Sequence, residues 1–242
     1  MDGFNAVMTE ANPFGASKDP RSALADALKR FKGRTALVSS FGSESAVLLH
    51  MVAQIDPDTP VLFLDTGQLF GQTLDYRKNL AKLLGLTDVR DLRPSFADLS
   101  TKDPKSDLWK TDTDGCCAIR KVAPLDRALE GFDLWITGRK RFHGASRLNL
   151  PLVEKADGRW KLNPLVNFTQ DELTAYVAEH ALPPHPLVEF GYRSVGCWPC
   201  TRPTEEGEDV RAGRWAGSEK TECGIHVDRP AFIGDADLGD GL

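Results

Sequence analysis

The 242-residue sequence contains no uninterrupted apolar run of about 18 residues, and residues 1–20 contain no basic stretch followed by an apolar run. We therefore expect no membrane span and no export signal, which places the protein in the cytoplasm. Positive charge is not in excess either, because 30 Lys and Arg residues stand against 35 Asp and Glu, for a net charge of −5. Binding to a phosphate backbone needs a basic face, so this balance argues against a nucleic-acid-binding protein.

Cysteine is scarce, and the arrangement of the five cysteines is informative. Four of them form two close pairs, Cys116 with Cys117 and Cys197 with Cys200, whereas Cys223 stands alone. Thiols in the cytoplasm are kept reduced, so the pairs do not indicate structural disulfides. Two pairs and one single thiol indicate a metal centre and a separate working cysteine.

The kind of metal centre stays open between zinc and a [4Fe-4S] cluster, because both take four thiolates. Structural zinc usually binds cysteines about two to four residues apart, and the adjacent Cys116 and Cys117 fit poorly around one small tetrahedral ion. A cubane offers four separate iron corners. The spacing therefore favours the cluster.

The remaining cysteine, Cys223, also has two interpretations. A free cysteine is most often a small buried hydrophobic residue. Cys223, however, has polar neighbours and a histidine, His226, three residues further on. Exposed thiols in such surroundings are typically reactive, and a cationic site would supply the thiolate.

Apolar periodicity predicts an α/β domain with alternating strands and helices. We expect helices over 22–31, 44–55, 69–84, 116–129 and 169–179, strands over 35–38, 61–64, 88–92 and 133–137, and a hairpin over 153–162. Continuous apolar strands indicate a mostly parallel, doubly wound sheet that is covered on both faces. Ligands of such sheets bind at the carboxyl ends of the strands.

The domain organisation follows from the same pattern. Residues 1–20 lack periodicity and are expected to form a flexible lead. Residues 21–203 are expected to form one nucleotide-binding α/β domain with the metal site. Residues 204–242 are rich in Gly and charge, and we expect a mobile C-terminal segment that carries Cys223.

The loop Ser39–Ser45 joins the first strand to the next helix, so its N–H groups and the helix dipole can bind an anion. It lacks the Gly-x-x-x-x-Gly-Lys-Ser/Thr pattern of a Walker loop, and an ordinary polar turn is the alternative. With the turn Asp65-Thr66-Gly67 and the later arginines, it resembles the modified phosphate loop of the adenine nucleotide α-hydrolase-like fold. The Gly-Gly-x-Asp-Ser core of that fold's ATP pyrophosphatases is absent, which favours a nucleotide other than ATP.

The two cysteine pairs, Arg211-Ala-Gly-Arg214-Trp215 and Glu222-Cys-Gly-Ile-His226 resemble the assimilatory adenylyl-sulfate reductases over about residues 20–227. These thioredoxin-dependent enzymes contain a [4Fe-4S] cluster. The cysteine pairs are typical of the cluster-bearing branch, and the Glu-Cys-Gly-Ile/Leu-His motif is shared with the cluster-free phosphoadenylyl-sulfate reductases. The resemblance implies reduction of adenylyl sulfate to sulfite and AMP in sulfate assimilation and cysteine biosynthesis, through a cysteine S-sulfonate that thioredoxin resolves.

The resemblance also implies roles for individual residues. It makes Cys223 the nucleophile and places Lys121 between cluster and substrate. The implied cluster ligands are Cys116, Cys117, Cys197 and Cys200. The implied substrate-binding residues are Ser39, Gly42, Ser43, Leu64, Asp65, Thr66, Arg147, Arg211 and Arg214. The segment 138–147 departs from the usual form of the family, which leaves the roles of Arg139, Arg141 and His143 open.

Several alternatives remain at this stage. The nearest is the same chemistry on 3′-phosphoadenylyl sulfate, or on both substrates. A tRNA-thiolating pyrophosphatase would need the missing Gly-Gly-x-Asp-Ser loop, and a zinc-stabilised nucleotide sensor would have an inert Cys223. Arg120 and Arg202 are left between solvated surface charges and site residues. The oligomeric state, including a homo-oligomer, is left open.

Overall fold

The computed structural model describes residues 19–144, 147–216 and 220–226. Its centre is a six-stranded sheet with the strand order β3-β2-β1-β4-β6-β5. The strands are β1 (Thr35–Ser39), β2 (Val61–Leu64), β3 (Val89–Leu92), β4 (Leu134–Ile136), β5 (Val153–Ala156) and β6 (Arg159–Leu162). All neighbouring strands are parallel except the β5–β6 hairpin. The predicted mostly parallel sheet is confirmed.

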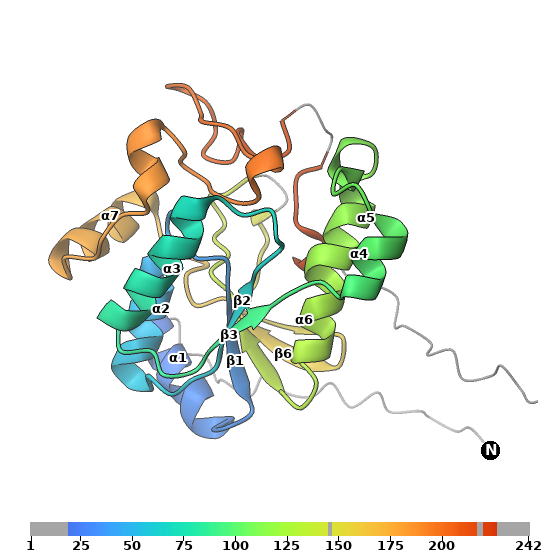
Figure 1. The fold of residues 1–242 in the computed structure, drawn as a ribbon. Coiled ribbons are helices and arrows are strands. Elements are labelled where there is room, and N and C mark those ends of the chain that lie inside the picture. Colours follow the sequence, from blue (N-terminus) through green and yellow to red (C-terminus); the bar gives the residue numbers. More distant parts are fainter. Residues whose placement is uncertain (1–18, 145–146, 217–219, 227–242) are drawn as a thin grey trace, which may run out of the picture.

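Helices cover both faces of the sheet, as a doubly wound fold requires (Figure 1). One face carries α1 (Pro20–Arg30), α2 (Ser45–Ile55), α3 (Gly71–Leu83) and α7 (Gln170–Glu179), and the other carries α4 (Phe96–Lys102), α5 (Thr113–Cys117) and α6 (Ala123–Ala128). The short helical turns are η1 (Leu108–Lys110), η2 (Ala118–Val122), η4 (Pro186–Phe190), η5 (Trp198–Cys200) and η6 (Gly224–His226). Within the described residues, no helix has the length and apolar character to cross a membrane.

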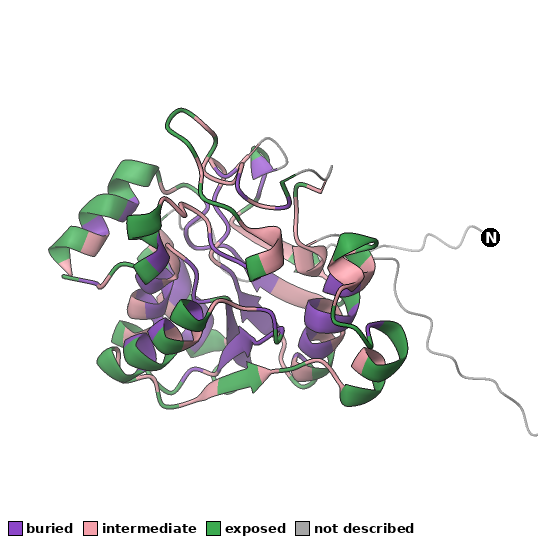
Figure 2. Cartoon of the chain, turned by 45° about the horizontal axis from the view of Figure 1, so that its top comes forward, coloured by how far each residue is buried: buried purple, intermediate pink, exposed green. Residues whose placement is uncertain are grey.

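The strands divide their side chains between two hydrophobic cores because successive residues of a strand point to opposite faces. In β2, Val61 and Phe63 belong to the larger core, which packs against α1, α2, α3 and α7. Leu62 and Leu64 belong to the smaller core, which packs against α6. The buried sheet lies inside exposed outer helix faces (Figure 2). Burial on both faces explains why the strands are continuously apolar in sequence.

Local signals in the sequence place the helix and strand ends. Thr169 and Glu172 form the predicted capping box at the start of α7. Asp157 and Gly158 both have positive φ, 52° and 75°, which matches the tight turn expected between β5 and β6.

Two helical features differ from the prediction. The expected helix over 116–129 begins at Thr113, after Asp112 accepts a hydrogen bond from the Gly115 N–H at 2.7 Å, and the π-helical turn η2 interrupts it. Helix α4 was not predicted. None of its residues is buried, so it leaves no apolar periodicity in the sequence.

Part of the predicted C-terminal segment 204–242 lies against the domain. Thr201 pairs with Arg214 in an isolated β-bridge, and Trp215 is 4% exposed. Further along, Ile225 of η6 packs against the smaller core. Residues 227–242, and all of the predicted lead except Asp19 and Pro20, lie outside the described residues. Mobility of the segment stays a prediction.

Candidate active site

A cavity of about 200 Å³ lies at the carboxyl ends of the parallel strands. This is the position that a ligand of an α/β sheet is expected to take. Its walls come from the loop after β1, the ends of β2 and β4, η2, and two C-terminal stretches that contain Trp215 and Cys223. The predicted site residues that line it are Ser39, Gly42, Ser43, Leu64, Thr66, Lys121, Arg147, Cys197, Arg211, Arg214 and Cys223. Most of the predicted substrate-binding residues therefore meet in one place.

The loop Ser39–Ser45 is held in shape by its own contacts. The Ser39 hydroxyl accepts a hydrogen bond from the Phe41 N–H at 3.1 Å, and Phe41 is fully buried with a φ of 48°. Ser43 donates to the Arg193 carbonyl at 2.8 Å. No side chain caps the N-terminus of α2. Ser45, the first residue of α2, lines the cavity, and a helix N-terminus in this position can bind an anion.

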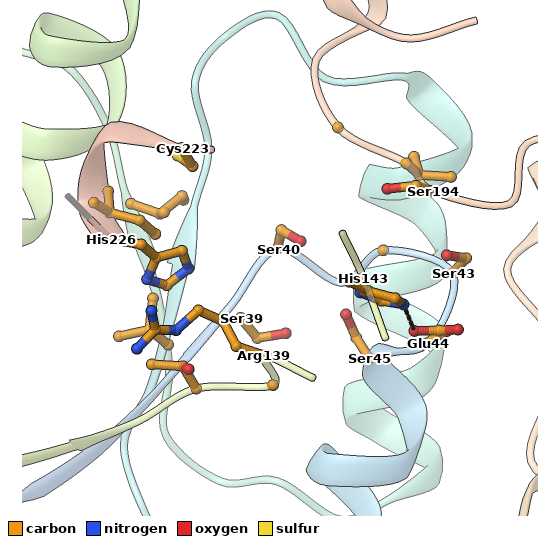
Figure 3. Close-up of a pocket in the computed structure, with 18 of the residues that line it drawn as sticks. Ser39, Ser40, Ser43, Glu44, Ser45, Arg139, His143, Ser194, Cys223 and His226 are labelled. Carbon is orange, nitrogen blue, oxygen red and sulfur yellow. Dashed lines mark ion pairs between the residues drawn. The ribbon is translucent and has the colours of Figure 1, made fainter. Parts of the chain in front are cut away.

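Glu44 of this loop forms an unpredicted ionic cluster with the buried Lys140 and His143. Lys140 donates to Glu44 at 2.5 Å, and His143 Nε2 lies 3.1 Å from the same carboxylate oxygen (Figure 3). Burial by itself would raise the pKa of Glu44, but His143 and Lys140 outweigh it and lower the pKa to about 2. Glu44 is therefore a carboxylate that neutralises one of the cations of the cavity wall.

Lys121 is 8% exposed and lies on η2. Burial by itself would lower its pKa, but the neighbouring Cys197, Cys223 and Cys117 raise it above its ordinary value. Lys121 therefore carries a positive charge between the paired cysteines and the lone cysteine. The π-helical turn places it there, and such turns are frequent at functional sites.

The paired cysteines lie together with two polar side chains of the turn after β2. Cys197 Sγ is 3.3 Å from the Thr66 hydroxyl, and Cys116 Sγ is 4.0 Å from Gln68 Oε1. Burial raises the pKa of the Cys116 thiol to about 12. Burial would also raise the pKa of Cys197, but Lys121 lowers it overall. All five cysteines are free thiols, and in the described residues no three His, Cys, Asp or Glu side chains are grouped to hold one metal ion.

Arg120 is neither a solvated surface charge nor a residue that lines the cavity. It is 3% exposed and donates to Asp103 at 2.6 Å and to the Thr66 carbonyl at 2.8 Å. This arrangement ties η2 to the turn after β2. Arg202, in contrast, is an exposed residue that pairs with Glu208 at 2.8 Å.

Arg211 and Arg214 both lie over the buried Trp215 ring, with guanidinium-to-centroid distances of 5.5 and 4.7 Å. Burial and the neighbouring Arg147 and Arg214 lower the pKa of Arg211 to about 10. Cations crowded in this way are stabilised by an anion. Asp65 is the exception among the predicted binding residues, because it pairs with Arg93 at 2.9 Å and does not line the cavity.

The segment with Cys223 closes the cavity opposite the loop after β1 (Figure 3). Cys223 is partly buried, and Glu222 beside it pairs with Arg147. The His226 ring stacks on Trp135 at 6.0 Å between ring centroids. Burial, with Arg139 and Lys161 nearby, lowers the pKa of His226 well below its ordinary value, so its imidazole is neutral.

The fold and cavity define an α/β nucleotide-binding protein. Cations line its cavity and can bind an anion, and the Cys223 thiol lines the same cavity. The family described as "Phosphoadenosine phosphosulfate reductase domain" matches residues 34–203, and the chain belongs to this family. The recognition made from the sequence motifs is thereby confirmed.

Named relatives agree with this assignment. Adenosine 5′-phosphosulfate reductase of Chelativorans sp. (strain BNC1) is 52% identical over 83% of this chain and 83% of that protein. The enzyme of the same name from Mesorhizobium japonicum is 50% identical over 81% of this chain and 78% of that protein. The crystal structure of phosphoadenylyl-sulfate reductase from Candida auris, a phosphate complex, has a TM-score of 0.64 and 28% identity, and covers 76% of this chain and 90% of that chain.

The sequence predictions missed several residues that line the cavity. They are Lys140, Ser194, Val195, Gly196, Glu222 and His226, whereas Ser40, Glu44 and Ser45 belong to the predicted anion-binding loop. Glu222 and His226 belong to the motif around Cys223, and that membership was the available signal. Gly196 has no such signal. A Cβ there would lie 2.2 Å from the Arg214 guanidinium group, so any side chain at this position would shift Arg214.

Proposed function

We propose that this protein reduces adenylyl sulfate to sulfite and AMP, with Cys223 as the nucleophile and thioredoxin as the reductant. One observation carries the proposal. Cys223 lines the same cavity as the strand-end loop and the cations Lys121, Arg211 and Arg214. The names of the relatives at 50–52% identity point to the same substrate.

Substrate binding uses the two ends of the cavity. The N–H groups of the loop Ser39–Ser45 and the guanidinium forks of Arg211 and Arg214 suit the oxygens of phosphate and sulfate. Leu64 and Thr66 line the wall next to the loop and are suited to contact the nucleoside. The arrangement brings the sulfate towards Lys121 and Cys223.

The reaction then takes three thiol steps. The Cys223 thiolate attacks sulfur, an S–S bond forms, and the S–O bond to AMP breaks with its electron pair on the AMP oxygen. A thioredoxin thiolate attacks the Cys223 sulfur of the S-sulfonate, and sulfite leaves with the electron pair of the S–S bond. The second thioredoxin thiol then attacks the resulting mixed disulfide and releases the Cys223 thiolate. The two electrons come from the thioredoxin dithiol. Lys121 stabilises negative charge on the sulfate oxygens during the attack.

We further propose that Cys116, Cys117, Cys197 and Cys200 hold a [4Fe-4S] cluster. Cys197 lies beside Thr66 and Cys116 beside Gln68, and the support for the cluster is the number of cysteines and the adjacency of Cys116 and Cys117, which suits a multi-iron group better than a single zinc ion. When bound, the cluster supplies a fixed local charge and a structural link. Four free ligand thiols also suit the reducing cytoplasm, where we place the enzyme.

The test is purification without oxygen, followed by iron and acid-labile sulfide assays and a turnover assay with thioredoxin. We expect about four irons and four sulfides per chain, as four-cysteine ligation implies, and sulfite release from adenylyl sulfate. Faster turnover of 3′-phosphoadenylyl sulfate would assign the alternative substrate. One zinc per chain and no sulfite from either nucleotide would contradict the proposal.

A further inference from the structure

Arg147 forms an ion pair with the Glu222 carboxylate of the same chain. Its Nε donates to Glu222 Oε2 at 2.6 Å and its Nη2 donates to Glu222 Oε1 at 2.8 Å. The Arg147 side chain is 7% exposed and the Glu222 side chain 16%. A bidentate pair shielded from water in this way is strong and fixes the orientation of both groups. The sequence resemblance had instead assigned Arg147 to the phosphosulfate.

Glu222 is also bonded to the backbone of the nucleophile. The Cys223 N–H donates to Glu222 Oε1 at 2.9 Å, so one carboxylate contacts both Arg147 and Cys223. Burial would raise the pKa of Glu222, but Arg147 lowers it overall, so the group stays ionised. The position of the Cys223 thiol is therefore set through Glu222 by the loop after β4.

Among the described residues after Cys223, three contact the rest of the domain. Ile225 packs against the smaller core and His226 stacks on Trp135. A Cβ at Gly224 would lie 3.2 Å from Val122, so the backbone runs close to η2. These contacts fix the end of the segment. Its approach to the cavity is held by the Lys220–Asp114 ion pair, by Arg211 donating to the Thr221 carbonyl at 3.4 Å, and by the Glu222 pair, which lies next to Cys223.

The remaining cations suffice for the substrate. Lys121, Arg211 and Arg214 line the cavity, and none of them forms the bidentate pair that holds Glu222. Arg211 Nη2 lies 3.7 Å from Glu222 Oε1, beyond hydrogen-bond distance. Two anionic groups of a phosphosulfate can therefore bind without displacing Glu222 from Arg147.

We propose that Glu222 is a positioning residue whose pair with Arg147 holds Cys223 at the cavity, so that Arg147 serves the C-terminal segment rather than the phosphosulfate. The inference rests on the proposed function, because it specifies how the nucleophile of that reaction is placed. A nucleophile displaced by about 1 Å can lose roughly 10²-fold in rate.

The experiment compares Glu222→Gln, which keeps the shape of the side chain and removes its charge, with Glu206→Gln as a matched control. Glu206 is exposed and lies in the same C-terminal segment. Adenylyl sulfate affinity is measured in a Cys223→Ser background, and the rate of S-sulfonate formation by intact mass in a single turnover at saturating substrate. We expect Glu222→Gln to slow the adduct about 10²-fold and to change affinity less than about 3-fold. Glu206→Gln should match the wild type in both.

A double-mutant cycle with Arg147→Met separates the two roles of the arginine. If the pair positions Cys223, the double variant loses no more adduct rate than Arg147→Met alone. If Arg147→Met weakens affinity more than about 10-fold while Glu222→Gln forms the adduct at the wild-type rate, the inference is overturned.

A readout without substrate distinguishes failure of this inference from failure of the proposed function. Alkylation of Cys223, followed by peptide mapping, should become several-fold faster in Glu222→Gln because the segment opens. A wild-type protein that forms no adduct contradicts the proposed function, whereas unchanged alkylation in Glu222→Gln contradicts the positioning role.

Discussion

The two faces of the sheet are built differently. The face under α1, α2, α3 and α7 has a large, almost wholly apolar core. The face under α6 has a small apolar core, and next to it lie the cysteines, Lys121 and the buried Arg120–Asp103 pair. The first face supplies stability in the ordinary way, by apolar burial. The second face adjoins the cavity on the side of the proposed nucleophile and Lys121, and its order depends on polar contacts that must all be satisfied.

The largest effect should come from Lys121→Ala on the second face. Removing a buried cation that stabilises charge during the reaction should lower kcat about 10²–10³-fold. The thermal midpoint should change little, because Lys121 belongs to neither core. Steady-state turnover and thermal unfolding measure the two effects. The exposed Lys110→Ala is the control, and equal turnover in both variants would remove Lys121 from the site.

Arg120→Met on the second face should lower the free energy of unfolding. It leaves Asp103 as an uncompensated buried charge, which should cost about 3–5 kcal/mol. Urea unfolding of the anaerobic protein measures this loss. Arg202→Met removes an exposed arginine with a similar carboxylate partner, and its unfolding midpoint should stay near that of the wild type. Equal midpoints for the two variants would show that the Arg120 pair does not hold the second face together.

Leu80→Ala tests the first face at a fully buried position in α3. We expect a loss of about 2–5 kcal/mol in the free energy of unfolding, as for other buried leucines. Iron content and the single-turnover rate should be unchanged at low temperature, because α3 contributes no side chain to the cavity. A loss of iron at equal soluble yield would show that the two faces are coupled.

The smallest expected effect is a pH dependence of the free energy of unfolding, and it comes from His185 on the first face. Its Nδ1 accepts the Leu187 N–H at 3.2 Å and its Nε2 lies 3.0 Å from the Thr73 hydroxyl, so the buried ring is neutral. Burial lowers the pKa of His185 to about 4, from an ordinary 6.5. The unfolded chain takes up the proton first as pH falls. The contribution of His185 to the free energy of unfolding is therefore fully present above pH 6.5. This free energy falls by about 2–3 kcal/mol towards pH 4.

Urea midpoints between pH 7.5 and 4 measure this dependence. Because carboxylates such as Glu44 also titrate towards acid pH, the informative quantity is the difference between the wild type and His185→Gln. The variant should show the shallower decline between pH 6.5 and 4. Parallel curves would mean that His185 does not titrate differently in the folded protein.

The fold was predictable because its signals are local. Period-2 and period-3.6 apolar patterns, the Asp157-Gly158 turn and the capping box at Thr169 each act within a few residues. Helix α4 escaped prediction because it buries no residue. The family could be recognised from motifs, because their spacing is visible in the sequence. The same motifs predicted that most of the candidate binding residues would lie together.

Partner choice in the site was not predictable from the sequence. The sequence around Arg120 does not show whether its side chain points to water or to Asp103, which lies seventeen residues away. The sequence around Arg147 did not indicate that it pairs with Glu222, which lies 75 positions further along the chain. Asp65 follows a strand end, as a binding residue would, yet it pairs with Arg93. Each case depends on which opposite charge is nearest in space.

The most direct test of the account is the intact mass of the wild-type protein and of Cys223→Ser after a single turnover with adenylyl sulfate and no thioredoxin. The account predicts one sulfonate on the wild type, located on the Cys223 peptide and removed by added thioredoxin, and none on the variant. A sulfonate on Cys223→Ser, or sulfite release from the wild type without any adduct, would contradict it.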